Sequence, residues 1–239
     1  MKILQLTAIA VCAATIAASA QTIQVSKENR TISVTATDKV TAMADTATVH
    51  IGFITYGPSS DVAYANGSRL SNAIVKTLNT AGVPSASIES ENQAVAPVQP
   101  YQVEKLTDAE KAQRKFQVTQ SWTVRTNAND AAKVLDLAVK AGANQSGQID
   151  WSFKDENAPE AEAAAKALQR ARTQAEQMAQ SLNAKLGALL YASNEVQASP
   201  IRPMMMRAMV AQKADTQPLA INPRQIEKSA TVTAIFAIE

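Results

Sequence analysis

The sequence contains one cysteine, few aromatic residues and no charge excess of either sign. Its 239 residues carry 23 Lys and Arg against 21 Asp and Glu, a formal charge of only +2. Electrostatic binding to nucleic acid requires a clear basic excess. Aromatic residues make up 4% of the chain, too few for platforms that stack bases. We therefore expect no nucleic-acid partner.

Glycine-rich phosphate loops and common hydrolase motifs are also missing. The seven glycines never form G-x-G-x-x-G or G-x-x-x-x-G-K, and neither H-E-x-x-H nor G-x-S-x-G occurs. The single histidine, His50, excludes a histidine metal cluster and would have to serve any Ser-His-Asp catalysis. It alternates with Thr46 and Thr48, which favours a residue on the polar face of a strand. We predict no catalytic residue and no cofactor, and rank an enzyme centred on His50 last.

The N-terminus has the features of an export signal. Lys2 precedes an apolar segment over residues 3–18, and Ala18-Ser19-Ala20 supplies the small residues that signal peptidase recognises. These features predict a signal peptide over residues 1–20, cleaved after Ala20, and a periplasmic location. The alternatives are a retained membrane anchor and lipidation of Cys12, but Val11 before that cysteine disfavours lipidation. The exported chain would contain no cysteine, so it could form no disulfide and no cysteine metal site.

Hydrophobic residues make up 46% of the sequence and charged residues 18%, enough apolar surface for a globular core. The 239 residues suit one large domain or two small lobes, for which we expect residues 21–126 and 127–239. Interspersed strands and helices indicate an α+β fold with antiparallel-rich sheets and three main helices. We expect strands over residues 22–37, 45–56, 85–97, 116–126, 148–154, 189–198 and 228–238, helices over 61–81, 130–141 and 159–186, and loops over 100–115 and 199–225.

Local signals place the helix ends. Ser59 or Ser60 and then Asn129 are expected to cap the first two helices, and Gly82 and Gly187 to end the first and third. The acidic pairs Asp155-Glu156 and Glu160/Glu162 lie at the third helix entrance, where negative charge favours a structural role over acid–base catalysis. Basic residues interleaved with acids predict a solvated face; these are Lys166, Arg170 and Arg172. The apolar stripe of that helix is expected at Ala161, Ala164, Ala165, Leu168, Ala171, Ala175, Met178, Ala179 and Leu182.

A methionine cluster lies within the expected long loop 199–225. It comprises Met204, Met205, Met206 and Met209, and it follows Pro203. Thioethers bind Cu(I) and also form adaptable contacts between subunits, so a packed loop, a subunit contact and a low-ranked copper site remain open. We expect this loop, with the charged insertion 100–115 nearby, to form a self-association surface.

Three blocks of the sequence resemble the SIMPL domain family of exported bacterial proteins. Residues 44–53, ADTATVHIGF, are similar to the family strand P-D-x-A-x-V-x-x-G-V. Residues 171–187 are similar to its A-[RK]-x-x-A-x-x-L-A-x-x-L-G-x-x-L-G helix end, with Asn183 in place of a glycine. Residues 217–233 resemble its T-P-I…G-x-I…A-x-V-x-V closing strand. The family's glycines after the first strand are Ala36 and Asp38 here, so the chain departs from the family at the turn expected over residues 36–45.

The resemblance implies a SIMPL-like, two-lobed α+β domain over residues 21–239. It also implies a periplasmic or outer-membrane-associated protein that forms homo-oligomers and acts in oxidative and envelope stress. The family provides no catalytic residue or cofactor that could be transferred. We therefore expect a non-enzymatic protein that acts by self-assembly. The alternative is a protein that binds Cu(I) or a small ligand through the methionine cluster.

Overall fold

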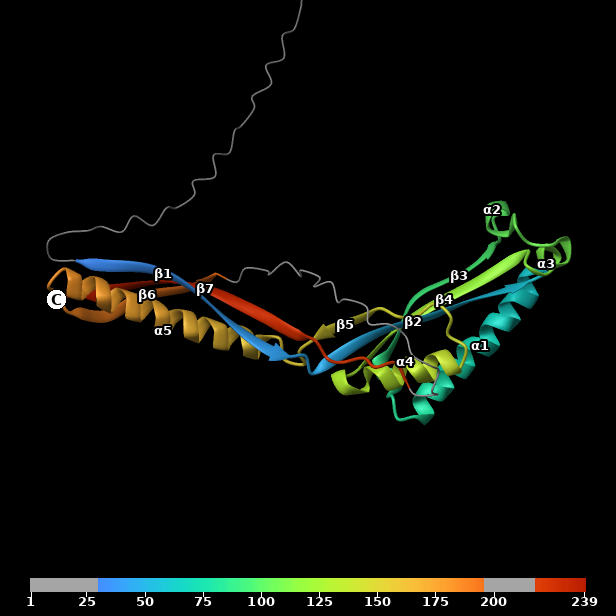
Figure 1. Cartoon of the computed structure of the whole chain (residues 1–239), viewed down its shortest axis with the longest axis horizontal. Helices are drawn as coiled ribbons and strands as arrows, with labels where there is room; N and C mark the ends of the chain where they lie inside the picture. The colour runs from blue at the N-terminus through green and yellow to red at the C-terminus, as the bar shows by residue number, and fades with distance from the viewer. Residues whose placement is uncertain (1–29, 196–217) are drawn as a thin grey trace, which may run out of the picture.

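The computed structural model describes residues 30–195 and 218–239, which form two lobes lying end to end (Figure 1). The strands are β1 (Thr31–Met43), β2 (Thr46–Gly57), β3 (Ile88–Pro97), β4 (Phe116–Asn127), β5 (Ile149–Ser152), β6 (Leu186–Glu195) and β7 (Gln225–Ile238). The helices are α1 (Ser60–Thr80), α2 (Pro100–Val103), α3 (Asp108–Gln113), α4 (Ala131–Lys140) and α5 (Asn157–Ser181), with short 3₁₀ turns η1 (Ser85–Ser87) and η2 (Ala128–Asp130).

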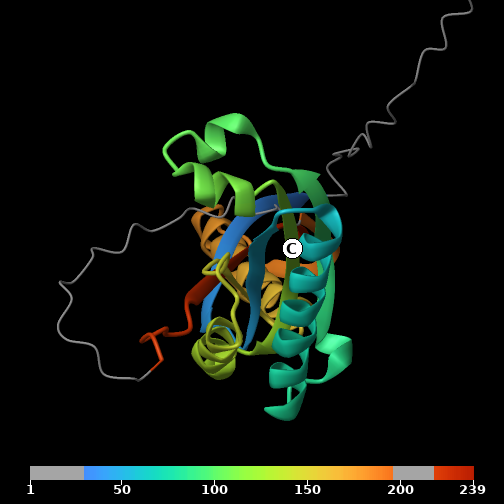
Figure 2. The same cartoon turned by 90° about the vertical axis from the view of Figure 1, so that its right-hand side faces the viewer.

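One sheet and one group of helices define each lobe. The three-stranded lobe has the strand order β1-β7-β6, with α5 packed on β1 and β7. The four-stranded lobe has the order β3-β4-β2-β5, with α1 and α4 on one face. Every strand pair is antiparallel, which confirms the α+β prediction. Figure 2 looks along the long axis and shows the two lobes one behind the other.

The lobes are not successive stretches of chain. β1 lies in one sheet with β6 and β7 from the other end of the sequence, while β2–β5 form the second sheet. The boundary expected after residue 126 therefore falls inside the four-stranded lobe. Threonine pairs join β1 to β7, with 2.9 Å between the Oγ1 atoms of Thr35 and Thr233 and the same distance for Thr37 and Thr231.

The turn expected over residues 36–45 is wrong, because residues 36–43 continue β1 and only Ala44 and Asp45 separate it from β2. The Asp45 carboxylate accepts hydrogen bonds from the Thr46 hydroxyl at 2.9 Å and from the Lys154 backbone N–H at 2.7 Å. The Ala44 N–H donates to the Arg224 carbonyl at 2.9 Å. These contacts fix the junction of the lobes without a glycine.

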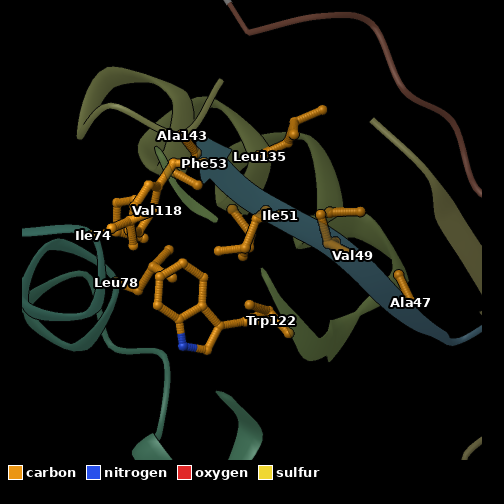
Figure 3. Close-up of a cluster of buried hydrophobic side chains, with 14 of the residues drawn as sticks. Ala47, Val49, Ile51, Phe53, Ile74, Leu78, Val118, Trp122, Leu135 and Ala143 are labelled. Carbon is orange, nitrogen blue, oxygen red and sulfur yellow. The ribbon is translucent and has the colours of Figure 1, made fainter. Parts of the chain in front are cut away.

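The core of the four-stranded lobe lies between its sheet and helices (Figure 3). Alternation along β2 buries the predicted face, which comprises Ala47, Val49, Ile51 and Phe53. Phe53 packs on Trp122 of β4 with ring centroids 5.8 Å apart. Residues 218–224, part of the expected loop 199–225, reach this lobe, where Ile221 packs against the core.

α1 has the predicted ends and packs closely on the sheet. The Ser59 hydroxyl accepts a bond from the Val62 N–H at 3.4 Å, and Gly82 after the helix has φ +92°. A Cβ on Gly67 would lie 2.7 Å from Cγ1 of Val118, so glycine permits this close approach to β4. The Asn129 cap is wrong: α4 begins after Asp130, without a side-chain cap.

α5 ends at Ser181, so the predicted end at Gly187 is wrong. Asn183 takes the left-handed conformation with φ 54°, and the Ala184 N–H donates to the Ala179 carbonyl at 2.9 Å. Asparagine tolerates this conformation and ends helices as glycine does. Gly187 instead lies in β6, which spans Leu186–Glu195 rather than residues 189–198.

The buried face of α5 also differs from the expected stripe. The alanines that face the sheet occur at every fourth residue of α5. A step of four residues is slightly more than one helical turn, so successive alanines lie on nearly the same side. Ala171, Ala175 and Ala179 pack on β1 and β7, as predicted. Ala161, Ala165, Met178 and Leu182 are exposed. The buried set is Ala163, Ala167, Ala171, Ala175 and Ala179.

Candidate functional site

His50 lies on the face of the four-stranded sheet opposite the core, as predicted. Its Nε2 is 2.8 Å from Oδ2 of Asp150 on β5, and its Nδ1 is 3.3 Å from Oε1 of Glu91 on β3. Residues from three strands therefore meet across the sheet. Glu91 is an extra residue in β3, because the β3–β4 register shifts between Ser90 and Asn92. This bulge brings its carboxylate to the imidazole.

Both nitrogens of the His50 ring face a carboxylate. A neutral imidazole donates from only one nitrogen, whereas the protonated ring donates from both. The hydrogen bond to His50, followed by that to Gln148, lowers the pKa of the Asp150 carboxyl below its ordinary value, against the opposing effect of burial. The arrangement binds three strands together and leaves neither ring nitrogen directed at a substrate. It favours a structural role for His50.

The acidic residues before α5 have structural partners. Asp155 accepts a bond from the Asn157 N–H at 3.0 Å, and Glu156 from the Phe153 N–H at 2.9 Å. Lys228 of β7 lies 2.7 Å from Glu156 and 3.2 Å from Glu160, joining the start of α5 to the sheet. These contacts lower the pKa of Glu156 and raise that of Lys228, in each case chiefly through their mutual hydrogen bond.

The remaining charged residues singled out in the sequence lie along α5. Glu162 pairs with Lys166 at 2.9 Å, and Arg172 with Glu176 at 3.1 Å. Arg170 donates to the Thr37 carbonyl at 3.4 Å. Lys166, Arg170 and Arg172 are all exposed, which agrees with the predicted solvated helix face.

The methionine cluster, Met204, Met205, Met206 and Met209, lies outside the described residues, as does the predicted signal peptide. Within residues 30–195 and 218–239, no group of three or more His, Cys, Asp or Glu side chains is arranged to hold a metal ion. The copper interpretation stays a prediction. Replacing all four methionines by Leu should abolish Cu(I) uptake in equilibrium dialysis if it is correct.

A surface that sequence reasoning missed lies on β6, at one edge of the three-stranded sheet. Three consecutive large apolar side chains are exposed there: Leu189 by 46%, Leu190 by 55% and Tyr191 by 47%. Among the described strands β6 pairs only with β7. We call these three residues and the open edge of β6 the β6 edge. The run of large apolar residues 189–191 is the sequence signal that could have indicated this surface. Only the strand order shows that the run lies at a sheet edge.

A second surface, of mixed polarity, lies at the opposite side of the same lobe. A groove of about 650 Å³ runs between β1 and α5, lined in part by Val34, Met178 and Leu182. Met178 is 47% exposed and Leu182 64% exposed. We call it the β1–α5 groove. Two different surfaces with exposed apolar side chains thus flank one small sheet.

The insertion 100–115 forms the exposed tip of the β3–β4 hairpin, as predicted. It folds into α2 and α3, and the Thr107 hydroxyl and the Glu110 carboxylate cap α3 reciprocally. It lies at the far end of the four-stranded lobe, away from the β6 edge (Figure 1). No helix in the described part of the chain is both long and apolar enough to cross a bilayer.

The described residues form a two-lobed α+β protein of two antiparallel sheets. A family model described as SIMPL, protein of unknown function (DUF541), matches residues 32–236, most of the chain. The chain therefore belongs to the SIMPL family, as its sequence blocks indicated. No curated protein matches it.

Proposed function

We propose that this SIMPL protein is a non-enzymatic protein of the bacterial periplasm that acts by self-assembly in oxidative and envelope stress. The export features at the N-terminus support the location. Assembly close to the outer membrane is part of the proposal. The observation that carries self-assembly is the β6 edge, with its three exposed apolar side chains.

An open strand edge presents unpaired backbone N–H and C=O groups to any second chain. Native monomers usually protect such edges with charges, prolines or covering segments. Leu189, Leu190 and Tyr191 are instead apolar, and α5 lies mainly over β1 and β7. Burying them against a second copy would remove apolar surface from water and pair the open backbone groups.

The contact we propose is head to tail: the β6 edge of one copy meets the β1–α5 groove of the next. These two surfaces differ and lie on opposite sides of one sheet. A contact between unlike surfaces repeats around a ring or along a filament, whereas a contact between like surfaces stops at a dimer. The two surfaces therefore favour an assembly of more than two copies.

The first experiment compares Leu190→Lys with Tyr101→Lys by mass photometry of the exported chain, residues 21–239. Tyr101 is 75% exposed on α2 and serves as the matched control. Leu190→Lys should lower the mass towards a monomer, because a lysine at the contact would have to lose its hydration. Tyr101→Lys should retain the wild-type mass. An unchanged mass for Leu190→Lys would exclude the β6 edge.

A mixing experiment tests the head-to-tail arrangement. Leu190→Lys retains an intact groove, and Leu182→Lys retains an intact β6 edge. Each variant alone should be monomeric, while an equimolar mixture should form dimers through the one intact pair of surfaces. If Leu182→Lys keeps the wild-type mass, the contact is instead made between two β6 edges.

The physiological claim is tested in a deletion strain exposed to hydrogen peroxide. Wild type and Tyr101→Lys should restore survival, and Leu190→Lys should not. A hydrolase or transferase turnover abolished by one polar substitution would contradict the non-enzymatic part of the proposal.

A further inference from the structure

A groove of about 470 Å³ opens at the end of the four-stranded lobe that faces the junction of the lobes. The turn after α1, the end of β4, one face of α4 and the segment after β5 form its walls. We call it the junction groove. Its volume lies within the range of about 300–1,000 Å³ typical of small-molecule sites.

The lining of the junction groove combines apolar residues with cationic ones. Val83 and Leu137, both half-buried, supply apolar surface, while Val134 behind them is buried. Arg125, Lys133 and Lys154 supply three positive charges from three separate elements. One carboxylate, Asp130, also lines the groove, so the charge of the lining is +3 − 1 = +2. A ligand with one anionic end and an apolar body would match this mixed lining.

The three cations have no carboxylate partner within residues 30–195 and 218–239, although some other lysines of these residues do. Lys140, Lys166 and Lys228 each pair with at least one carboxylate. Within the described part of the chain, the guanidinium group of Arg125 and the ammonium groups of Lys133 and Lys154 make no ion pair or hydrogen bond. The Asp130 carboxylate accepts a bond from the Asn127 amide at 3.3 Å. The cations are therefore available to an external anion.

The walls of the groove are held in place by hydrogen bonds of the backbone and of the Asp45 side chain. The Asp45 carboxylate binds both the Thr46 hydroxyl and the Lys154 N–H, and the Asp45 carbonyl accepts a bond from the Ala128 N–H at 2.9 Å. At the opposite wall the Val83 N–H donates to the Leu78 carbonyl at 3.1 Å. A site fixed in this way loses little conformational entropy when it binds a ligand.

We propose that the junction groove binds a small organic anion with an apolar body. A carboxylate, sulfonate or phosphate end lies against Arg125, Lys133 and Lys154, and the apolar body lies on Val83 and Leu137. The formal charge of the whole chain, only +2, gives no general attraction for anions, so the selectivity comes from this local grouping. The inference goes beyond the proposed function and does not depend on self-assembly.

The test uses two fluorescent probes with similar apolar bodies. 8-Anilino-1-naphthalenesulfonate carries a sulfonate, and N-phenyl-1-naphthylamine is uncharged. The triple variant Arg125→Gln, Lys133→Gln, Lys154→Gln should weaken binding of the sulfonate by about tenfold or more, since three exposed charge contacts are lost. Affinity for the uncharged probe should change by less than about twofold, as expected when charge contacts are absent.

A matched triple variant controls for net charge. Lys105, Lys115 and Lys185 are exposed and do not line the groove. Replacing these three by Gln removes the same charge and should leave the sulfonate affinity within about twofold of wild type. Equal losses of sulfonate affinity in the two triple variants would overturn the proposal. The single variant Lys133→Gln, on the exposed side of α4, should show a smaller loss of affinity in the same direction.

Amide chemical shifts locate the bound probe. Addition of the sulfonate should move the signals of Ser87, Thr126 and Leu137, which line the junction groove. Signals of Gln177 and Ser181 report instead on the β1–α5 groove. Shifts confined to this second pair would overturn the assignment.

Discussion

The side-chain amide of Asn144 binds both backbone groups of Ile54. Its Nδ2 donates to the Ile54 carbonyl at 3.0 Å, and its Oδ1 accepts from the Ile54 N–H at 2.8 Å. β5 pairs only with residues 46–49 of β2, so it leaves the rest of this strand edge open. The segment after α4 covers the edge, with the N–H groups of Asn144 and Gln145 both donating to the Gly52 carbonyl at 3.0 Å. The Asn144 side chain thus makes the two hydrogen bonds to Ile54 that a residue of a neighbouring strand would otherwise make.

Asn144→Ala should lower the free energy of unfolding by about 1–2 kcal/mol, since two hydrogen bonds are lost. Chemical denaturation measures this change. Asn129→Ala is the control, because Asn129 was expected to cap α4 but does not do so. It should change stability by less than about 0.5 kcal/mol, as surface substitutions usually do. A larger loss of stability at Asn129 than at Asn144 would contradict both the role given to Asn144 and the absence of a capping role for Asn129.

Gly67→Ala should destabilise the protein although alanine favours helices by about 1 kcal/mol over glycine. The new Cβ would lie 2.7 Å from Cγ1 and 3.2 Å from Cβ of Val118, a stiff side chain on β4. We expect a net loss of about 1–2 kcal/mol from this overpacking, measured by denaturation. Val118→Ala should remove the clash, so Gly67→Ala should cost less in that background. Equal costs in the two backgrounds would show that the contact is unimportant.

Lys228→Met should reduce stability in a pH-dependent way. The pKa of Glu156 is lowered from 4.5, so its contribution is present above that pH and is lost as pH falls through the folded value. The pKa of Lys228 is raised from 10.5, so its contribution is present below that pH and is lost as pH rises through the folded value. The loss in the free energy of unfolding relative to wild type should therefore be greatest near neutral pH, at about 1 kcal/mol.

Thermal unfolding across the pH range measures this difference, with Lys39→Met as control. Lys39 pairs with Glu227 at 2.8 Å, but both side chains are more than half exposed. Its replacement should have the smaller effect at neutral pH and greater sensitivity to salt. A pH-independent loss in Lys228→Met would indicate that packing of its aliphatic chain, rather than charge, stabilises the contact.

His50→Val should raise the pKa of the Asp150 carboxyl towards 3.8, because the hydrogen bond to His50 is the chief cause of its lowering. A carboxyl ¹³C titration by NMR measures the shift. The stabilisation from this contact is present above pH 3.8 and is lost as pH falls through the folded pKa. Gln148→Ala should raise the Asp150 pKa less, since Gln148 is the second cause. An unchanged Asp150 titration in His50→Val would contradict the observed pair.

Local sequence determined the elements and much of their orientation. The alternation in residues 46–53 predicted the buried face of β2, because side chains on a strand alternate between two sides wherever it pairs. Ser59 and Gly82 predicted the ends of α1, since capping depends on a few neighbouring residues. The hairpin insertion and the polar position of His50 followed from equally local patterns.

Tertiary structure decided which distant segments meet. β1 pairs with β7 rather than with a neighbour in sequence, so the two lobes could not be derived as successive halves. Glu91 and Asp150 reach His50 only because a bulge and a short edge strand lie on either side of it.

At the end of α5, local helix-ending signals compete with the pairing of distant strands. Asn183 and Gly187 are both suitable helix terminators, and local propensity favours glycine. The structure uses Asn183, because residues from Leu186 onward pair with β7. Periodicity and local capping signals thus determined most of the elements and the polar face, and the sequence motifs indicated the family. Strand pairing between distant segments decided the lobes, the β6 edge and the junction groove, since such contacts depend on packing of the whole chain.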